Sequence, residues 1–247
     1  LGVGWLGKPL AIELIKNGHA VKGSTTTNEK INELKENGIE PYLIDINELG
    51  DISDFLNSSV LVIAITSKKV EAYQELVKKI ENSEIRRIIY ISSTSVYKSE
   101  NKTVTEDSRL TPSALLEIEE LFKQNQNFEC TILRFAGLFG EDRKPGRFFK
   151  PNMPIKNPDG FVNLIHQDDC IQIIDKIIST NCWQITLNAC ADSHPTRRDF
   201  YSKELAKVGI MNPEFKSDSS YKYKIVSSKK LKTRLNYEFK HSDLMKI

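Results

Sequence analysis

The chain opens with the stretch Leu1-Gly2-Val3-Gly4-Trp5-Leu6-Gly7, a G-x-G-x-x-G pattern that leads into an amphipathic helix. Apolar residues recur at helical spacing up to Ile15, Asn17-Gly18 is a typical helix end, and residues 20–23 predict a second strand. A glycine turn can be purely structural. Followed by a helix and a strand, however, it is typical of a site for a phosphate-bearing dinucleotide.

Each part of this stretch has a predicted role. Gly2 would make the tight turn, Gly4 would let the backbone approach the pyrophosphate, and Gly7 would let the helix pack closely on the strand. The backbone at Trp5 and Leu6 would then contact the phosphates. A glycine fingerprint should follow a strand, yet only Leu1 precedes this one. We therefore expect the native chain to begin further upstream, where a targeting signal would be invisible here.

Composition narrows the function classes. The 247 residues carry a net charge of only +2, so no overall field attracts nucleic acid or a membrane surface, and no apolar run reaches the length of a membrane span. Cys130, Cys170, Cys182 and Cys190 lack metal-ligand spacing even with His194 nearby, so neither a metal site nor a disulfide framework is predicted. Reduced, mostly buried thiols suit the cytoplasm. The expected partner is a small-molecule substrate. The oligomeric state stays open.

Strand and helix patterns alternate along the chain without repeats. This alternation predicts an α/β fold, a Rossmann-type doubly wound parallel sheet. Residues 1–140 would form the dinucleotide-binding lobe and residues 141–247 a smaller substrate lobe that returns elements to the core, as one integrated unit. Residues 141–160 predict a long surface excursion. Further strands are expected at 42–45, 60–65, 87–92, 130–135 and 184–187, and further helices at 30–37, 70–80, 115–122, 169–179, 198–209 and 229–235.

The carboxyl ends of the strands should carry the cofactor contacts, including Ala64, Ile65 and Ser92. After the second strand, Ser24-Thr25-Thr26 brings hydroxyls and no carboxylate before Glu29. NAD-preferring enzymes place an acid there for the ribose 2′-hydroxyl, so NADP(H) is favoured over NAD(H).

Two cations, Lys22 and Lys30, would be in reach of a 2′-phosphate. An alternative interpretation is that Thr27 or Asn28 caps the next helix, and both roles could coexist.

Five motifs in the correct order resemble those of the extended short-chain dehydrogenases/reductases, the group that includes nucleoside-diphosphate-sugar epimerases and dehydratases. The resemblance covers essentially the whole chain. The stretches are Tyr90–Tyr97 (family S-S-x-x-V-Y-G), Thr105-Glu106-Asp107 with Pro112, Leu133–Gly140 (L-R-x-x-x-x-Y-G), Val162–Asp169 (N-x-I-H-x-x-D) and Ser227–Tyr237 (S-x-K-L…L-G-Y).

The resemblance implies roles for individual residues. Ser93 stands where the family has its catalytic hydroxyl, although the serines there could simply satisfy backbone groups. Tyr97 is a weaker candidate, as a substitute acid. Asp45 stands near the adenine in the family, or is a turn residue. The implied substrate contacts, each with a structural alternative, are Arg147 in a basic stretch that suits diphosphates, Asn163 and His166. Asp169 is interpreted as a helix cap.

The chain departs from the family at its catalytic Y-x-x-x-K pair. With Glu119 aligned on the family's glutamate, the lysine position holds Leu115 and the tyrosine position roughly Thr111. No tyrosine occurs from residue 98 to residue 200. Because leucine cannot supply the charge, the standard proton-transfer pair is absent.

Two functions therefore remain from the sequence. The first is an NAD(P)-dependent, epimerase/dehydratase-like oxidoreductase that acts atypically or weakly on a nucleotide-sugar or a similar hydroxylated metabolite. The second is a non-catalytic NADP(H)-binding sensor or interaction module on the same fold.

Overall fold

A computed structural model describes residues 1–140, 142–149, 153–211, 213–217 and 220–247. The chain forms two compact units, which we describe separately. The first consists of residues 1–92, 111–133 and 171–186, and the second of residues 93–110, 134–170 and 187–247. The chain therefore passes from one unit to the other at several points.

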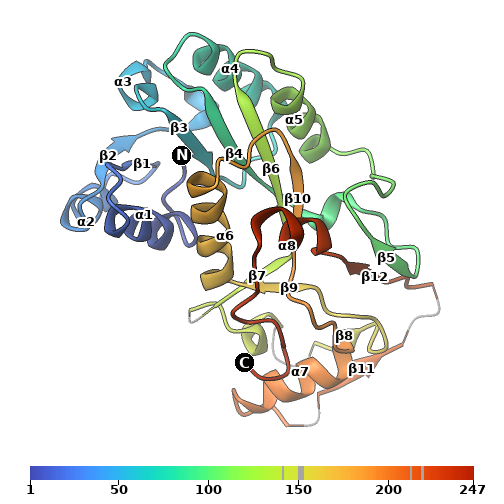
Figure 1. The fold of residues 1–247 in the computed structure, drawn as a ribbon. Helices are drawn as coiled ribbons and strands as arrows, with labels where there is room; N and C mark the ends of the chain where they lie inside the picture. The colour runs from blue at the N-terminus through green and yellow to red at the C-terminus, as the bar shows by residue number, and fades with distance from the viewer. Residues whose placement is uncertain (141, 150–152, 212, 218–219) are drawn as a thin grey trace. The chain divides into compact units, whose positions relative to one another are not determined.

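A parallel sheet with the strand order β10-β6-β4-β3 forms the centre of the fold (Figure 1). In β3 (Val60–Ile63) and β4 (Arg87–Ser93), Val60 lies opposite Arg87 and Ile63 opposite Tyr90. β6 spans Glu129–Phe135 and β10 spans Thr186–Ala189. The predicted α/β fold is confirmed.

A second parallel pair, β1 (Lys22–Thr25) and β2 (Glu40–Leu43), belongs to the first unit. Residues 1–3 link this pair to β3. The Leu1 nitrogen donates to the Val62 carbonyl at 2.7 Å, and the Val3 N–H donates to the Ser24 carbonyl at 2.8 Å. The opening glycines thus lie between two strands, as a dinucleotide-binding turn requires.

The helices of the first unit follow the predicted apolar patterns closely. α4 and α5 pack on each other, and rings from a helix and a strand, such as Phe122 and Tyr90 (centroids 5.1 Å apart), stack in the core. α1 ends at Lys16, and Gly18, two residues further on, has a φ of 87°. The helices are α1 (Gly7–Lys16), α2 (Lys30–Glu36), α3 (Ser53–Leu56), α4 (Val70–Glu81) and α5 (Ala114–Lys123), with the 3₁₀ turn Ile46–Glu48.

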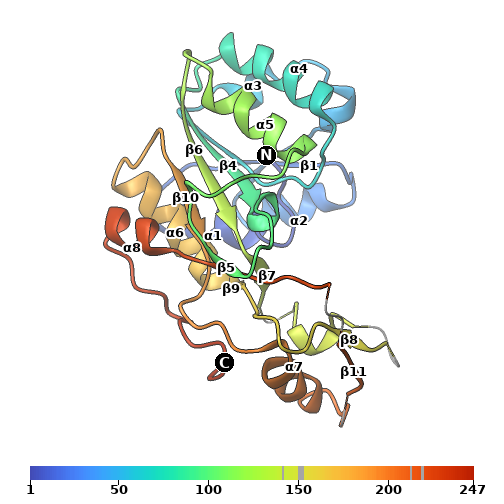
Figure 2. The same ribbon diagram turned by 90° about the vertical axis from the view of Figure 1, so that its right-hand side faces the viewer.

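The second unit contains three short parallel pairs that local patterns did not predict, because each strand has only two or three residues and a distant partner. They are β5 (Lys102–Val104) with β12 (Lys224–Val226), β7 (Gly137–Phe139) with β9 (Leu164–His166), and β8 (Ile155–Lys156) with β11 (Phe215–Lys216), the last pair visible in Figure 2. Its helices are α7 (Arg197–Ala206) and α8 (Lys229–Leu235), while α6 (Gln167–Ser179) begins in it and ends in the first unit.

Two expectations need correction. The strand predicted at 184–187 begins at Thr186, because Gln184 has a φ of 55°, which a strand cannot accommodate. In the segment 141–160, residues 141 and 150–152 lie outside the described ranges, but the 3₁₀ turn Pro145–Arg147 is partly buried. A Cβ on Gly146 would lie 2.3 Å from the Glu204 carbonyl oxygen, so this part packs on α7 and is no free surface loop.

None of the helices within the described ranges has the length and apolar character needed to cross a membrane.

Candidate functional site

The opening glycine turn shows why three glycines are needed. Gly2 has a φ of 91°, and a Cβ on it would lie 2.5 Å from Ile65 Cγ2. A Cβ on Gly7 would lie 2.2 Å from the Gly2 carbonyl oxygen. Gly4 differs, because it is exposed and a Cβ there would meet no protein atom within 4 Å. Gly2 and Gly7 thus leave no room for a side chain in this turn, whereas Gly4 faces open space.

The start of α1 suits an anion. The N-cap residue, Leu6, makes no side-chain capping bond, and the first turn contains no acidic residue. No side chain therefore covers the helix start, where the helix dipole places a partial positive charge. The Lys8 N–H already donates to the Gly4 carbonyl at 2.9 Å, and Pro9 carries no N–H. Leu6 itself is buried and Trp5 is half-buried beside it.

The hydroxyls at the end of β1 divide into structural and exposed groups. Ser24 is buried, and its Oγ accepts the Gly2 N–H at 2.8 Å, so it holds the glycine turn. Thr25 is also buried, and its Oγ1 accepts the Thr27 N–H at 3.1 Å. Thr26 is exposed. Of the three predicted ribose contacts, Thr26 is therefore the one whose side chain is open to solvent.

The two lysines predicted to reach a 2′-phosphate differ in their contacts. Lys22 donates from Nζ to the backbone carbonyls of Asp54 and Asn57, and so it is committed elsewhere in the first unit. Lys30 begins α2 and is exposed. The alternative role of Thr27 or Asn28 as an N-cap is wrong, since Glu29 holds that position and no side chain caps the helix.

The neighbouring strand ends carry the remaining predicted cofactor contacts. Ala64 and Ile65 pack against the turn at Gly2. Asp45 is exposed and accepts the Asn47 N–H at 2.8 Å, which fits its interpretation as a turn residue and leaves a carboxylate at the surface.

Ser92, also predicted as a cofactor contact, forms a side-chain hydrogen bond within the first unit. Its hydroxyl donates to the fully buried Glu119 carboxylate, with the oxygens 2.5 Å apart, and so Ser92 connects β4 to α5.

In the second unit, the loop after β4 carries the candidate reactive groups. Ser93 Oγ accepts the Ser95 N–H at 3.1 Å, so it caps the 3₁₀ turn Thr94–Val96 and keeps its own proton to donate. Tyr97 is 2% exposed, donates to Asn188 Oδ1 at 2.7 Å and accepts from Arg134 at 2.7 Å. Burial raises the pKa of Tyr97. This geometry gives the phenol a structural role, and its role as a substitute acid stays a prediction.

Of the three predicted substrate contacts, Asn163 and His166 form hydrogen bonds within the protein. Arg147 is exposed. The Asn163 amide donates to the Lys224 carbonyl at 2.9 Å and accepts the Val226 N–H at 2.8 Å, so it clamps β12. His166 Nδ1 accepts the Asp168 N–H at 3.1 Å at the start of α6.

The prediction that Asp169 caps α6 is wrong, because the helix begins at Gln167 and Asp169 lies within its first turn. Fully buried, it accepts from the Tyr237 hydroxyl at 2.7 Å and from the backbone N–H groups of Lys240 and His241, and so it anchors the C-terminal segment.

One side-chain cluster in the described ranges has the donor types of a metal site, namely His166, Asp168 and His241. Its members already satisfy one another. Asp168 pairs with Lys240 and with His241, and the two imidazole rings lie 3.8 Å apart. Burial, followed by the neighbouring His241, lowers the pKa of His166. The expectation of no metal site remains a prediction.

The structure also brings forward a residue that the sequence pattern did not single out. Lys224 is half-buried in β12, and its Nζ donates to the Tyr97 carbonyl at 2.7 Å. In the sequence it is one of several lysines, near Lys222, Lys229 and Lys230, and only the pairing of β12 with β5 distinguishes it.

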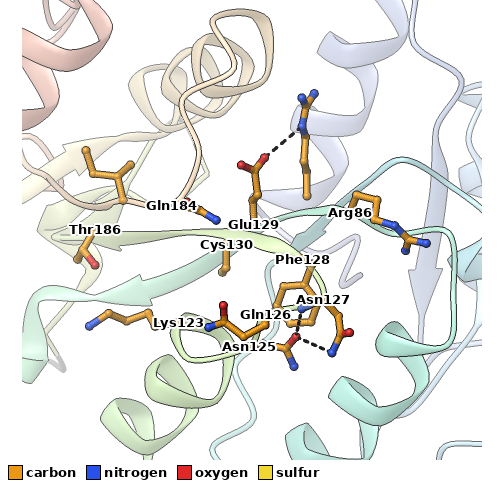
Figure 3. Close-up of a pocket in the computed structure, with 12 residues that line it drawn as sticks. Arg86, Lys123, Asn125, Gln126, Asn127, Phe128, Glu129, Cys130, Gln184 and Thr186 are labelled. Carbon is orange, nitrogen blue, oxygen red and sulfur yellow. Dashed lines mark hydrogen bonds and ion pairs between the residues drawn. The ribbon is translucent and has the colours of Figure 1, made fainter.

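A cavity of about 610 Å³ lies at the amino ends of β4, β6 and β10 (Figure 3). Its charged groups are already paired, since Arg87 contacts Glu129 at 3.6 Å and donates to Asn181 at 2.9 Å. Ligands of open parallel sheets bind at the carboxyl ends of the strands, where the glycine turn lies. The candidate cofactor site is therefore at the glycine turn.

Comparison with known proteins agrees with this geometry. Residues 2–161 match the family described as NAD(P)H-binding, and the chain belongs to that family. Protein YeeZ of Escherichia coli K12 is 33% identical, over 98% of this chain and 95% of that protein.

Solved structures show the same fold at lower identity. A functionally unknown conserved protein from Silicibacter pomeroyi superposes with a TM-score of 0.82 and 19% identity, covering 98% of this chain and 93% of that one. UDP-glucuronic acid 4-epimerase from Bacillus cereus, in complex with UDP-glucuronic acid and NAD, superposes with a TM-score of 0.81 and 21% identity, covering 99% and 93%. The predicted resemblance to the short-chain dehydrogenase/reductase fold is confirmed.

Proposed function

We propose that this chain is an NADP(H)-preferring, epimerase/dehydratase-like oxidoreductase of the cytoplasm that acts on a nucleotide-sugar or a similar hydroxylated metabolite. The observation that carries the proposal is Gly4, an exposed glycine between two sterically required ones, beside a helix start without a cap. The dinucleotide, when bound, supplies a nicotinamide that accepts or donates hydride. The chain itself binds the pyrophosphate through backbone N–H groups, and Ser93 donates its hydroxyl proton to a substrate oxygen.

The preference for NADP(H) follows from the end of β1. Thr26 and Lys30 are exposed there, and residues 24–28 include no carboxylate that would bind the 2′-hydroxyl or repel a 2′-phosphate. Calorimetry should therefore show tighter binding of NADPH than of NADH. Tighter NADH binding would refute the assignment, and no binding of either would refute the proposed function.

A matched pair of variants tests the binding mode. Gly4→Val should abolish NADPH binding but leave the folding stability nearly unchanged, because its side chain meets no protein atom and only the ligand's space is filled. Gly50→Val is the control, since its Cβ also meets no atom within 4 Å. Equal NADPH affinity in both variants would show that the glycine turn does not hold the pyrophosphate.

A non-catalytic NADP(H)-binding module is the second candidate, and a specific observation favours it. Helix α5 carries Leu115 at the lysine position, and exposed Thr111 precedes the helix. An NADP⁺ or NAD⁺ reaction with a panel of nucleotide-sugars, followed at the absorbance of the reduced nicotinamide, separates the two candidates. Measurable turnover that falls in Ser93→Ala supports the enzyme; binding without any turnover supports the module.

A further inference from the structure

The carboxylate of Glu33 connects the two helices that begin next to the end of β1. Lys8, one residue after Gly7, donates from Nζ to Glu33 Oε1, and this ion pair joins α1 to α2 across 25 positions of sequence. Lys30 and Glu33 are three residues apart in α2, so their side chains are neighbours on the helix surface, with Cβ atoms about 5–6 Å apart. One carboxylate therefore interacts with two ammonium groups.

These side chains border the end of β1, where the adenosine ribose is proposed to bind. The Gly2 N–H donates to Ser24 Oγ at 2.8 Å, which holds the glycine turn, and with it the start of α1, against β1. α2 begins four residues after the exposed Thr26, and the Lys30 N–H donates to the Thr27 carbonyl at 3.1 Å. All of these residues belong to the first unit. The starts of both helices thus lie beside the same strand end.

The charges at this strand end are not balanced. Lys8 shares the Glu33 carboxylate, and Lys30 forms no ion pair with any residue in the described part of the chain. Lys22 is already bound to backbone carbonyls. The hydrogen bond and the charge of Lys8 are the largest causes that lower the pKa of Glu33, and the charge of Lys30 adds to them. Two ammonium groups therefore face one carboxylate, an arrangement that suits an anion of higher charge.

We propose that Lys8 and Lys30 together bind the 2′-phosphate of NADP(H), and that Glu33 occupies this anion site in the free protein. This inference rests on the proposed function. A phosphate monoester carries about −1.5 to −2 charges at pH 7, so it competes effectively with a singly charged carboxylate for the two ammonium groups. On binding, Lys8 Nζ exchanges Glu33 Oε1 for a phosphate oxygen. The Glu33 side chain is 46% exposed and can turn to solvent. NAD(H), with a 2′-hydroxyl, leaves the ion pair intact.

A first experiment removes each cation and compares two dinucleotides that differ only in the 2′-phosphate. In calorimetry, Lys8→Gln and Lys30→Gln should each weaken NADPH binding by about 10-fold, since each loses one hydrogen bond to a charged group. NADH binding should stay close to that of the wild type. Lys16→Gln is the matched control, because Lys16 lies at the other end of α1 and pairs with Glu13 at 3.7 Å. It should bind both dinucleotides like the wild type.

A second experiment removes the competing carboxylate. Glu33→Gln should tighten NADPH binding by about 2–5-fold, because an exposed ion pair of this kind contributes only a small free energy, and it should leave NADH binding unchanged. Glu36→Gln, at an exposed position one turn further along α2, is the control and should change neither affinity. The melting temperature of all these variants should stay close to that of the wild type, since the substituted side chains are not buried.

The outcomes separate this proposal from the proposed function. If Lys8→Gln loses NADPH and NADH affinity equally, or binds NADPH as tightly as Lys16→Gln does, Lys8 does not bind the 2′-phosphate and the proposal is overturned. Unchanged or weaker NADPH binding in Glu33→Gln also overturns it. In each of these cases the wild type still binds NADPH, and the proposed function stands. A wild-type protein that binds neither dinucleotide would refute the proposed function itself, and this proposal with it.

Discussion

At the scale of single residues, Gly2 and Gly7 have close neighbours that a side chain would meet, whereas Gly4 faces open space. Gly7→Ala forces a Cβ to within 2.2 Å of the Gly2 carbonyl oxygen. The backbone must shift, so the free energy of unfolding should fall by about 1–3 kcal/mol in urea titrations. Gly50→Ala, in open space, is the control and should match the wild type. Equal stability of the two variants would mean that the turn is less tightly packed than this geometry indicates.

Tyr97 gives a second prediction at this scale. Tyr97→Phe removes the donor to Asn188 Oδ1 and an acceptor from the buried Arg134. Leaving buried polar groups unsatisfied typically costs about 1–3 kcal/mol, so we expect that loss in the free energy of unfolding. Turnover, corrected for the folded fraction, should stay within a few-fold of wild type. A hundredfold loss in a folded Tyr97→Phe protein would support the phenol as the substitute acid.

At the scale of elements, the second unit depends on side chains that hold short strands in place. Asn163→Ala removes both bonds from the Asn163 amide to β12. Hydrogen–deuterium exchange should speed up in residues 224–226 and in their β5 partners, residues 102–104, with about 1–3 kcal/mol lost in stability. Asn127→Ala, in an exposed turn, is the control. Unchanged exchange in β12 would show that strand pairing alone holds it.

Elements with long local patterns were predictable and short ones were not. α4, α5 and α8 occupy nearly their predicted ranges, since apolar spacing over seven or more residues defines a helix locally. β5 and β12 have three residues each and pair across about 120 positions of sequence. Such pairing depends on chain closure and burial, which leave no local pattern.

At the scale of the whole molecule, two histidines predict how stability responds to acid. Burial lowers the pKa of both His166 and His194 in the folded chain. The unfolded chain, with a histidine pKa of about 6.5, then binds more protons than the folded chain below that pH. The contribution of these two histidines to the free energy of unfolding should therefore be fully present above about pH 6.5. Stability should fall as the pH drops below that value.

Urea titrations from pH 7.5 to pH 5 test this sign, with two variants as matched comparisons. His194→Gln should flatten the slope, whereas His19→Gln, at an exposed position, should not. A stability that rises on acidification in this range would contradict the expected direction.

The sequence by itself determined the parallel α/β fold and the place of the dinucleotide turn, because apolar periodicity and glycine geometry are local properties. It also determined that Leu115 cannot act as the family's lysine. Only the tertiary structure decided which hydrogen-bond partner each polar side chain has. Ser24 and Asn163 hold backbone groups, and Lys224 lies against the Tyr97 carbonyl. Those roles depend on which distant groups are brought within hydrogen-bond distance, and on burial, which spacing along the chain does not specify.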